Sequence, residues 1–422
     1  MKINFVKINI LFISFILIFS WFYTCFADDS IIDNETMDVS AEISKTKQNT
    51  LSNLDPASIN SRACIVLDRK SSTIIYGKNE KNRVKMASTT KIMTATIVIE
   101  NYDLSKTVEV SKKAAGTGGS RLGLKHGDKI SVLDLLHGLM LCSGNDAAVC
   151  LAETVAGGIP EFAEMMNNKA KELGLENTHF ESPHGLDSDN HYTTAYDLSL
   201  LTNYALNNET FLKIVGTKNY TVTINGYPKN ITNTNELLGT LNGVYGVKTG
   251  FTNGANRCLV TACKRNDLDI ICVVLGADTK RFRTKDSIKL IEYTYQNYEY
   301  INIGDLIDEN LNNWKENNFN KFNVFKGVSN DIEIYYPKLK SSVIPIKKEY
   351  KESIEVIINI ETNLNAPVYE NSSLGKLYIL CNGQEIFSTD ILSSSYIPKK
   401  NISNYYLDFF RNYSNLLNKF NI

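Results

Sequence analysis

LVTACKRNDLDIICVVL, residues Leu259–Leu275, is the stretch that best reveals the architecture of this chain. Leu259–Lys264 and Leu268–Leu275 are short apolar runs, rich in β-branched residues, with the length of buried strands. Arg265-Asn266-Asp267 between them is polar and short enough for a tight connection. The sequence therefore predicts an antiparallel β-hairpin here.

Beyond this hairpin the pattern alternates between blocks of strands and blocks of helices. Further strands are predicted at Ala63–Leu67, Ser72–Tyr76, Tyr220–Ile224 and Val244–Thr249. Helical patterns fill the interval from Ala87 to about Leu173, and Ser131 and Thr194 each precede an Asp by three residues, as helix N-termini often do. An amphipathic helix is predicted at Arg283–Tyr298. Such blocks favour an α+β fold with an antiparallel sheet.

Length and composition narrow the class of protein. A chain of 422 residues predicts two or three folded units. With 43% hydrophobic and 22% charged residues it is neither wholly disordered nor a multi-span membrane protein. Because 45 Lys+Arg balance 46 Asp+Glu, the chain has no overall electrostatic reason to bind nucleic acid.

The N-terminal segments predict export. Residues 1–27 combine Lys2 and Lys7 with an apolar run that ends in small residues, which is typical of a secretory signal peptide. An uncleaved membrane anchor is the alternative, since the run is about long enough to span a bilayer. Residues 28–57 are polar and acidic and predict a flexible stalk. We therefore expect the protein at the outer face of the cytoplasmic membrane or in the cell wall.

The remaining chain divides into three parts. Residues 58–299 are expected to form the main domain, and residues 300–395 a smaller β-rich domain in which no helical pattern follows Ile301. In residues 396–422, Ser403–Ile422 carries apolar residues at helical spacing. This helix can lie in the plane of a membrane surface or dock on its own domain, and the pattern alone does not separate the two.

Cysteine and histidine spacing argues against metal or disulfide frameworks. Signal-peptide cleavage would leave seven cysteines, an odd number, with no C-x-x-C pair. The five histidines show no H-E-x-x-H motif. We expect the cysteines to be small buried hydrophobes and the protein to need no cofactor or metal.

Two polar clusters at helix ends could carry chemistry. Ser88 and Lys91 are one helical turn apart, so a neutral lysine amine could take the hydroxyl proton. Ser143 and Asn145 lie between two apolar helices and could present a hydroxyl and an amide at one point. Taken singly, each is equally explained by ordinary helix capping.

A third cluster ends a predicted strand. Lys248 and Thr249 could hold a carboxylate by charge and hydrogen bonding, and Gly250 would let a ligand approach the backbone closely. A solvated lysine at a strand end is the alternative. Gly116–Gly123, by contrast, lacks the phosphate-binding pattern and is expected to be a flexible loop at the mouth of the site.

Ser-x-x-Lys, Ser-x-Asn and Lys-Thr-Gly in this order are the three motifs of the penicillin-binding protein and β-lactamase superfamily. The flanking residues narrow the match. Met86–Ala95, Ser143–Ala148, Val247–Thr252, Pro183–Leu186 and His191–Asp197 resemble the low-molecular-weight D-alanyl-D-alanine carboxypeptidases, the S11 serine peptidases. The resemblance covers about Pro56 to Leu392. It implies an antiparallel sheet with flanking helices, an all-helical lobe and a smaller C-terminal β-rich domain.

The resemblance also implies roles for the motif residues. Ser88 would be the acylated nucleophile, Lys91 its general base, and Ser143 the group that relays a proton to the leaving D-alanine. The substrate would be bound by the remaining motif residues, namely Asn145 on its amide, Lys248, Thr249 and Gly250 at its carboxylate, and Phe251 with Ser88 through backbone N–H groups that form the oxyanion hole. The implied substrate is the peptidoglycan pentapeptide stem, with β-lactams as covalent inhibitors. His184 and His191 are expected to be structural.

One segment departs from the family, and two other functions remain open. Ala255-Asn256-Arg257 stands where the family usually has Ala-Gly, which could alter that loop. A β-lactamase would add a Glu-x-x-Leu-Asn segment between the second and third motifs, and none is present between Asn145 and Lys248. An inactive cell-wall-binding scaffold is disfavoured because all three motifs are intact.

Overall fold

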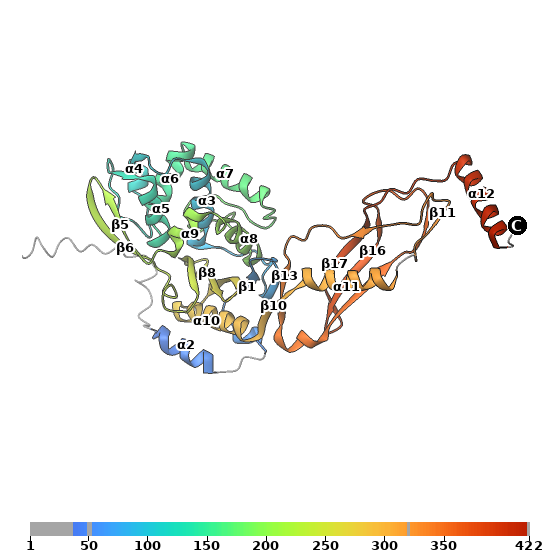
Figure 1. Ribbon diagram of the computed structural model, residues 1–422. Coiled ribbons are helices and arrows are strands. Elements are labelled where there is room, and N and C mark those ends of the chain that lie inside the picture. The colour runs from blue at the N-terminus through green and yellow to red at the C-terminus, as the bar shows by residue number, and fades with distance from the viewer. Residues whose placement is uncertain (1–36, 49–52, 319–320, 420–422) are drawn as a thin grey trace, which may run out of the picture. The chain divides into compact units, whose positions relative to one another are not determined.

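The computed structural model describes residues 37–48, 53–318 and 321–419. The chain divides into two compact units, which we call the N-terminal unit, Met1–Gln296, and the C-terminal unit, Asn297–Ile422 (Figure 1). The sequence placed the corresponding boundary between residues 299 and 300. The predicted signal peptide lies outside the described residues.

A five-stranded antiparallel sheet forms the centre of the N-terminal unit, in the order β2-β1-β9-β8-β7. Its strands are β1 (Ala63–Asp68), β2 (Ile74–Lys78), β7 (Val244–Thr252), β8 (Asn256–Arg265) and β9 (Leu268–Ala277). The predicted hairpin is confirmed, because Arg265 pairs with Leu268. The turn between these strands is only Asn266-Asp267, and Asn266 has a left-handed φ of 51°, which suits a two-residue connection.

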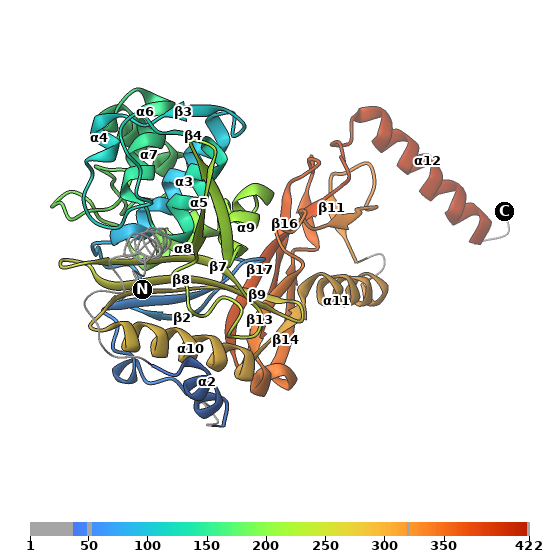
Figure 2. The ribbon, with the colours of Figure 1, turned by 90° about the vertical axis from the view of Figure 1, so that its left-hand side faces the viewer.

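Helices cover both faces of this sheet. Figure 2 shows α10 (Lys280–Asn297) on one face and the helical block on the other. The block contains α3 (Lys91–Asn101), α4 (Lys112–Ala115), α5 (Val132–Leu141), α6 (Asn145–Ala156), α7 (Ile159–Glu172), α8 (Ala195–Ala205) and α9 (Glu209–Gly216). The predicted N-caps are confirmed, since Ser131 Oγ and Thr194 Oγ1 accept the N–H groups of Asp134 and Asp197. Because helices cover it on both sides, every residue of β1 is buried.

A second, smaller sheet borders the helical block, in the order β3-β4-β5-β6. Its strands are β3 (Thr107–Glu109), β4 (Lys129–Ser131), β5 (Asn219–Ile224) and β6 (Tyr227–Thr232). Asp134 at the start of α5 accepts the N–H of Thr223 and the hydroxyl of Tyr220, which ties this sheet to the block.

The expectation of a structureless stalk over residues 28–57 is wrong for its middle part. Val39–Gln48 form the helix α2, in which Ile43 and Thr46 are buried. Glu42 of this helix lies 4.0 Å from Lys285 of α10. Because Ile43 is the only buried apolar residue of this helix, the sequence has no repeating apolar pattern at helical spacing, and the helix was not predicted.

The C-terminal unit contains a long helix that the sequence prediction missed. Helix α11 (Ile303–Asn317) begins at Asn302, whose side chain accepts the N–H groups of Gly304 and Asp305. Ile303, Ile307 and Leu311 bury one stripe of it, while the rest is polar and rich in Asn. The prediction that residues 300–395 contain no helix after Ile301 is therefore wrong.

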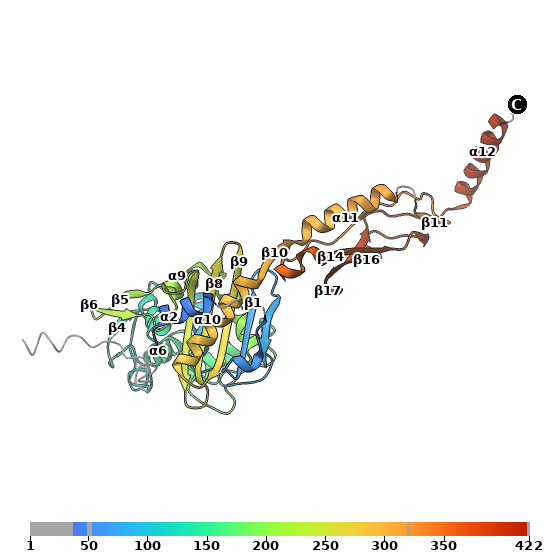
Figure 3. The ribbon, with the colours of Figure 1, turned by 90° about the horizontal axis from the view of Figure 1, so that it is seen from below.

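A four-stranded antiparallel sheet lies beside α11, in the order β12-β17-β16-β14 (Figure 3). Its strands are β12 (Ile334–Tyr335), β14 (Ile354–Ile360), β16 (Ser373–Cys381) and β17 (Gln384–Ser393). Two short pairs complete the unit, β10 (Tyr298–Asn302) with β13 (Val343–Lys347), and β11 (Asn323–Phe325) with β15 (Asn363–Asn365). The β-rich domain expected from the sequence is present.

The last helix, α12 (Ile402–Lys419), exposes its apolar residues. Its large exposed side chains are Ile402, Tyr405, Tyr406, Leu407, Phe409, Phe410, Tyr413 and Leu416. Phe409 and Phe410, for example, are 64% and 63% exposed, so the helix is not docked by this stripe on its own domain. In the part of the chain that the structure describes, no helix is both long and apolar enough to cross a bilayer.

Candidate active site

Ser88 lies in a short 3₁₀ helix, Ala87–Thr90, that leads into α3. Ala87 has a left-handed φ of 48°, a backbone conformation that costs a non-glycine residue about 1–2 kcal/mol. Ser88 is partly exposed, whereas Ala87, Thr89 and Thr90 are buried. The turn therefore presents one hydroxyl to solvent from an otherwise buried segment.

Lys91 is fully buried beneath this hydroxyl. Its Nζ lies 2.8 Å from Ser88 Oγ, 2.7 Å from Asn145 Oδ1 and 3.0 Å from the carbonyl oxygen of His184. Burial, together with the positive charge of Lys248, holds the pKa of Lys91 well below its usual value. Both effects favour the neutral form of the amine.

The three hydrogen-bond neighbours of Lys91 Nζ are compatible with a neutral amine. A neutral lysine has two N–H donors and one lone pair. The carbonyl oxygens of Asn145 and His184 can only accept, so they take the two N–H groups. The lone pair is then left for the third neighbour, the Ser88 hydroxyl, which can donate its proton to Nζ.

Ser143 lies on the turn between α5 and α6, and Asn145 is the first residue of α6. Asn145 is 3% exposed, and its Nδ2 donates to the Gly118 carbonyl at 2.8 Å while its Oδ1 faces Lys91. Ser143 is 4% exposed with a left-handed φ of 63°, and its hydroxyl makes no hydrogen bond within the described residues. Asn145 is thus hydrogen-bonded to Lys91, which in turn contacts Ser88, and Ser143 lies two residues before Asn145 in the chain.

Strand β7 brings the third motif beside the same turn. A Cβ on Gly250 would lie 3.0 Å from the backbone nitrogen of Ser88, so only glycine lets this strand approach so closely. The sequence predicted that Gly250 makes room for a ligand, but the Ser88 turn itself occupies part of that space. Lys248 and Thr249 are 1% and 3% exposed, and Thr249 Oγ1 lies 2.6 Å from Thr234 Oγ1.

Three residues outside the assigned catalytic and binding roles also shape the site, namely His184, Gly185 and Asp146. The carbonyl of His184 accepts from Lys91, and the next residue, Gly185, has a φ of 86°. A Cβ on Gly185 would overlap the carbonyl oxygen of Ala87 at 1.9 Å. The third residue, Asp146, is described below. Gly185, preceded by Pro183 and His184, was visible in the sequence, but its contact with the Ser88 turn joins distant segments and leaves no local signal.

Asp146 fastens the loop that borders the site. This carboxylate is fully buried and accepts the N–H groups of Leu122, Gly123 and Leu124 at 2.8–3.0 Å. The backbone N–H of the preceding Asn145 donates to the Ser120 carbonyl at 2.7 Å. The loop around Gly116–Gly123, expected from the sequence to be flexible, is therefore tied down at its C-terminal half.

Two histidines lie near the site, of which His184 is partly exposed and His191 is buried. Burial lowers the pKa of His184 to about 3 and that of His191 to about 4. His191 Nε2 lies 2.8 Å from Thr90 Oγ1, and its Nδ1 accepts the N–H of Glu181. Thr90 Oγ1 in turn donates to the Ala87 carbonyl, so His191 stabilises the left-handed turn at Ala87 through Thr90.

The unusual Ala255-Asn256-Arg257 segment keeps the backbone that a glycine would give. Asn256 has a left-handed φ of 57°, and Asn tolerates this region better than most residues. Arg257 is 1% exposed, and its guanidinium lies 3.8 Å from the centre of the Phe251 ring. The departure from the family pattern therefore leaves the turn shape intact.

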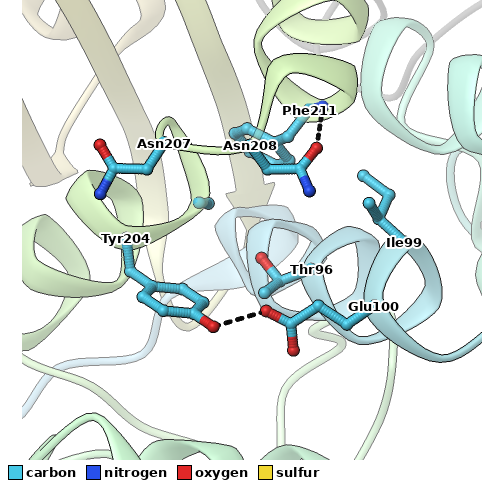
Figure 4. A pocket seen from close by; sticks show the side chains of 8 residues that line it. Thr96, Ile99, Glu100, Tyr204, Asn207, Asn208 and Phe211 are labelled. Carbon is cyan, nitrogen blue, oxygen red and sulfur yellow. Dashed lines mark hydrogen bonds between the residues drawn. The ribbon is translucent and has the colours of Figure 1, made fainter.

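A separate cavity of about 230 Å³ lies between α3, α8 and α9 (Figure 4). Its lining includes Glu100 and Tyr204, joined by a hydrogen bond of 2.7 Å, and none of the three motifs. Lys169 lies 3.0 Å from Glu100, so these charges are already paired. Within the described ranges no cluster of three or more His, Cys, Asp or Glu side chains could hold a metal ion.

Comparisons with known proteins agree with this geometry. Residues 47–279 match the family of D-alanyl-D-alanine carboxypeptidases, peptidase S11, and residues 314–399 match the penicillin-binding protein 5 C-terminal domain. The chain is 32% identical to the D-alanyl-D-alanine carboxypeptidase DacF of Bacillus subtilis, over 80% of this chain and 86% of that protein.

Solved structures show the same likeness. The D-alanyl-D-alanine carboxypeptidase DacD of Francisella tularensis superposes with a TM-score of 0.66 at 27% identity, covering 82% of this chain and 96% of that one. Penicillin-binding protein 5 of Haemophilus influenzae gives 0.67 at 27% identity, covering 82% and 100%. The chain therefore belongs to the D-alanyl-D-alanine carboxypeptidase family of serine peptidases, with a penicillin-binding protein 5 C-terminal domain after the catalytic one.

Proposed function

We propose that this enzyme removes the terminal D-alanine from peptidoglycan pentapeptide stems through an acyl-enzyme on Ser88. The observation that carries the proposal is the fully buried Lys91 amine, 2.8 Å from Ser88 Oγ and held by two carbonyl acceptors. A neutral amine in that position can take the hydroxyl proton as Ser88 Oγ attacks the carbonyl carbon of the penultimate D-alanine.

The neighbouring groups would stabilise the tetrahedral intermediate and the leaving group. The Ser88 N–H, which donates no hydrogen bond to a described residue, and the Phe251 N–H would form the oxyanion hole. Ser143 would pass a proton to the departing D-alanine nitrogen. Water would then attack the ester and return the Ser88 hydroxyl, releasing the shortened stem.

Substrate binding would use the groups around this hydroxyl. Lys248 and Thr249 would hold the terminal carboxylate of the substrate by charge and hydrogen bond, with Gly250 keeping β7 against the Ser88 turn. Asn145 would bind the substrate amide while it orients Lys91. β-Lactams, which present a similar carboxylate beside a strained amide, would acylate Ser88 and block the enzyme.

Ser88→Ala tests the assignment. We expect this variant to lose both labelling by a fluorescent penicillin and D-alanine release from diacetyl-Lys-D-Ala-D-Ala, because no other described hydroxyl contacts Lys91. The wild-type enzyme should be labelled stably and should release D-alanine. Rapid turnover of the penicillin would instead indicate a β-lactamase, and absence of labelling an inactive scaffold. Full activity of Ser88→Ala would remove the assignment.

We also propose that the protein works outside the cytoplasm, held at the membrane surface by α12. The sequence of residues 1–27 supports export, and the exposed aromatic stripe of α12 supports contact with the interfacial region of a bilayer. Deleting Ser403–Ile422 should move the protein from the membrane to the soluble fraction without changing D-alanine release from a soluble peptide. Unchanged membrane association would contradict the role of α12.

A further inference from the structure

Strand β14 is an open edge of the C-terminal sheet. In the order β12-β17-β16-β14 it has one strand neighbour, β16. Its sequence, IEVIINI at Ile354–Ile360, contains one charged residue and no proline. Natural edge strands are usually short or protected by charges, prolines or bulges, because exposed backbone groups recruit other strands. This edge has seven residues and almost none of that protection.

The register identifies which backbone groups face outward. The Glu361 N–H bonds the Leu374 carbonyl, and the Asn382 N–H bonds the Ser353 carbonyl. In an antiparallel ladder such bonding pairs recur at every second residue. Glu355, Ile357 and Asn359 therefore bond β16, and the four residues between and beside them turn their N–H and C=O groups to the free edge: Ile354, Val356, Ile358 and Ile360. Within the described chain none of these outward groups has another hydrogen-bond partner.

Helix α11 turns this edge into a groove. Two cavities of about 630 and 670 Å³ lie along it, one beside Ile354 and Val356 and the other beside Ile358 and Ile360. The helix lines them with side chains four residues apart, Leu306 and Asn310 in the first and Trp314 and Asn318 in the second. Residues at this spacing share one helical face. We call these two cavities the groove between α11 and β14; the second is also lined by Ser373, Leu374 and Gly375 at the start of β16.

The charges in the groove are uneven. The first cavity is lined by Asp305, Glu309 and Glu352 against one cation, Lys351, which is paired with Glu299 at 2.7 Å. The second cavity has Lys321 and Glu361 in balance, beside the Trp314 ring. An occupant with positive charge at the Ile354 end and apolar side chains toward Trp314 would complement both.

We propose that the groove between α11 and β14 binds an extended peptide segment of a partner protein, which adds as a fifth strand to the C-terminal sheet. An added strand can pair with the whole row of alternating N–H and C=O groups at once, and alternate side chains of that strand would enter the two cavities. The partner segment carries Lys or Arg where it passes Asp305 and Glu309.

A fluorescent peptide, Lys-Lys-Thr-Val-Thr-Val-Thr-Val, tests it by anisotropy against the full-length protein. We expect saturable binding that weakens with added salt, and no binding of the same peptide N-methylated at every second amide. Ile358→Pro removes one outward N–H without removing a β16 bond, so the fold is retained and the peptide Kd should rise at least tenfold. The control Ile357→Thr changes an exposed side chain and keeps the backbone, so its Kd should stay within twofold.

Residue-resolved hydrogen exchange gives a readout that does not depend on the variants. The amides of Val356 and Ile358 should exchange freely in the protein alone and become protected by the peptide, whereas Ile357 should be protected in both. Three results would overturn the proposal: equal protection of all three amides without peptide, unchanged affinity in Ile358→Pro, or a concentration-dependent dimer that Ile358→Pro abolishes. The last would assign the edge to a second copy of the chain.

Discussion

The two units differ in how many polar and charged side chains they bury. In the N-terminal unit the sheet is covered on both faces, and Lys91, Lys248 and Asp146 are almost or wholly inaccessible. In the C-terminal unit strands alternate between covered and exposed residues, as in β14, and Ser393 is the one buried polar residue among those described. Burying a charge is costly unless chemistry or exact pairing requires it. The N-terminal unit therefore buries the charged groups of the candidate active site, whereas the C-terminal unit is a sheet whose strands leave every second residue accessible to solvent.

Lys91→Met should show the largest difference between the units. Removing the amine leaves Ser88 without a general base, so the rate of acylation by labelled penicillin should fall about 10³–10⁴-fold. Lys351→Met, which removes an exposed cation of the C-terminal unit, should change that rate less than twofold. A Lys91→Met rate within tenfold of wild type would mean that another group accepts the proton.

Asp146→Ala should destabilise the N-terminal unit and loosen the loop beside the site. Three backbone donors lose a buried carboxylate acceptor, so the free energy of unfolding should fall by about 3 kcal/mol, measured by urea titration. Acylation should slow about tenfold as well. The matched control is Asp134→Ala, which removes a carboxylate that bonds Thr223 and Tyr220 instead. It should lose stability with acylation unchanged, and equal slowing in both variants would refute a specific role for the loop.

His191 should make the N-terminal unit sensitive to acid. Burial lowers its pKa from 6.5 to about 4, so between these values the unfolded chain binds a proton that the folded chain does not. Stability should therefore fall as the pH drops from about 6.5 to about 4, by about 1.4 kcal/mol per pH unit for this residue.

His191→Gln should remove that contribution to the slope, measured from urea midpoints followed by circular dichroism. The C-terminal unit contains no histidine and should lack this dependence. Its unfolding can be followed by Trp314 fluorescence in a Trp21→Phe background. An unchanged slope in His191→Gln would show that this imidazole already carries a proton in the folded protein.

Most features that were predicted correctly from the sequence depend on clear apolar periodicity or on short motifs. Local patterns predicted the α+β class, the hairpin at Leu259–Leu275 and both N-caps, whereas the grouping of Ser88, Lys91 and Asn145 was implied by the resemblance to the family through the order of its motifs. They depend on local patterns or on a fixed order of motifs, which a single sequence displays directly.

The helices and contacts that the sequence did not predict lack a local sequence pattern. Helix α11 buries a stripe one residue wide, and α2 buries little more than Ile43, so polar residues mask their period. The contacts of Asp146 with Leu122–Leu124 and of Gly185 with Ala87 join segments distant in sequence. Such positions are set by tertiary packing, and no window along the chain contains both partners.

Chemical modification of the cysteines can report which part of the molecule has unfolded. All seven described thiols are buried, and burial raises the pKa of Cys64 and Cys150 to about 12, so these two are almost never present as the reactive thiolate. Alkylating agents and oxidants therefore reach them only when the surrounding structure parts. Cys381 lies in the C-terminal unit and the other six in the N-terminal unit, so the site of a modification reports which unit had unfolded.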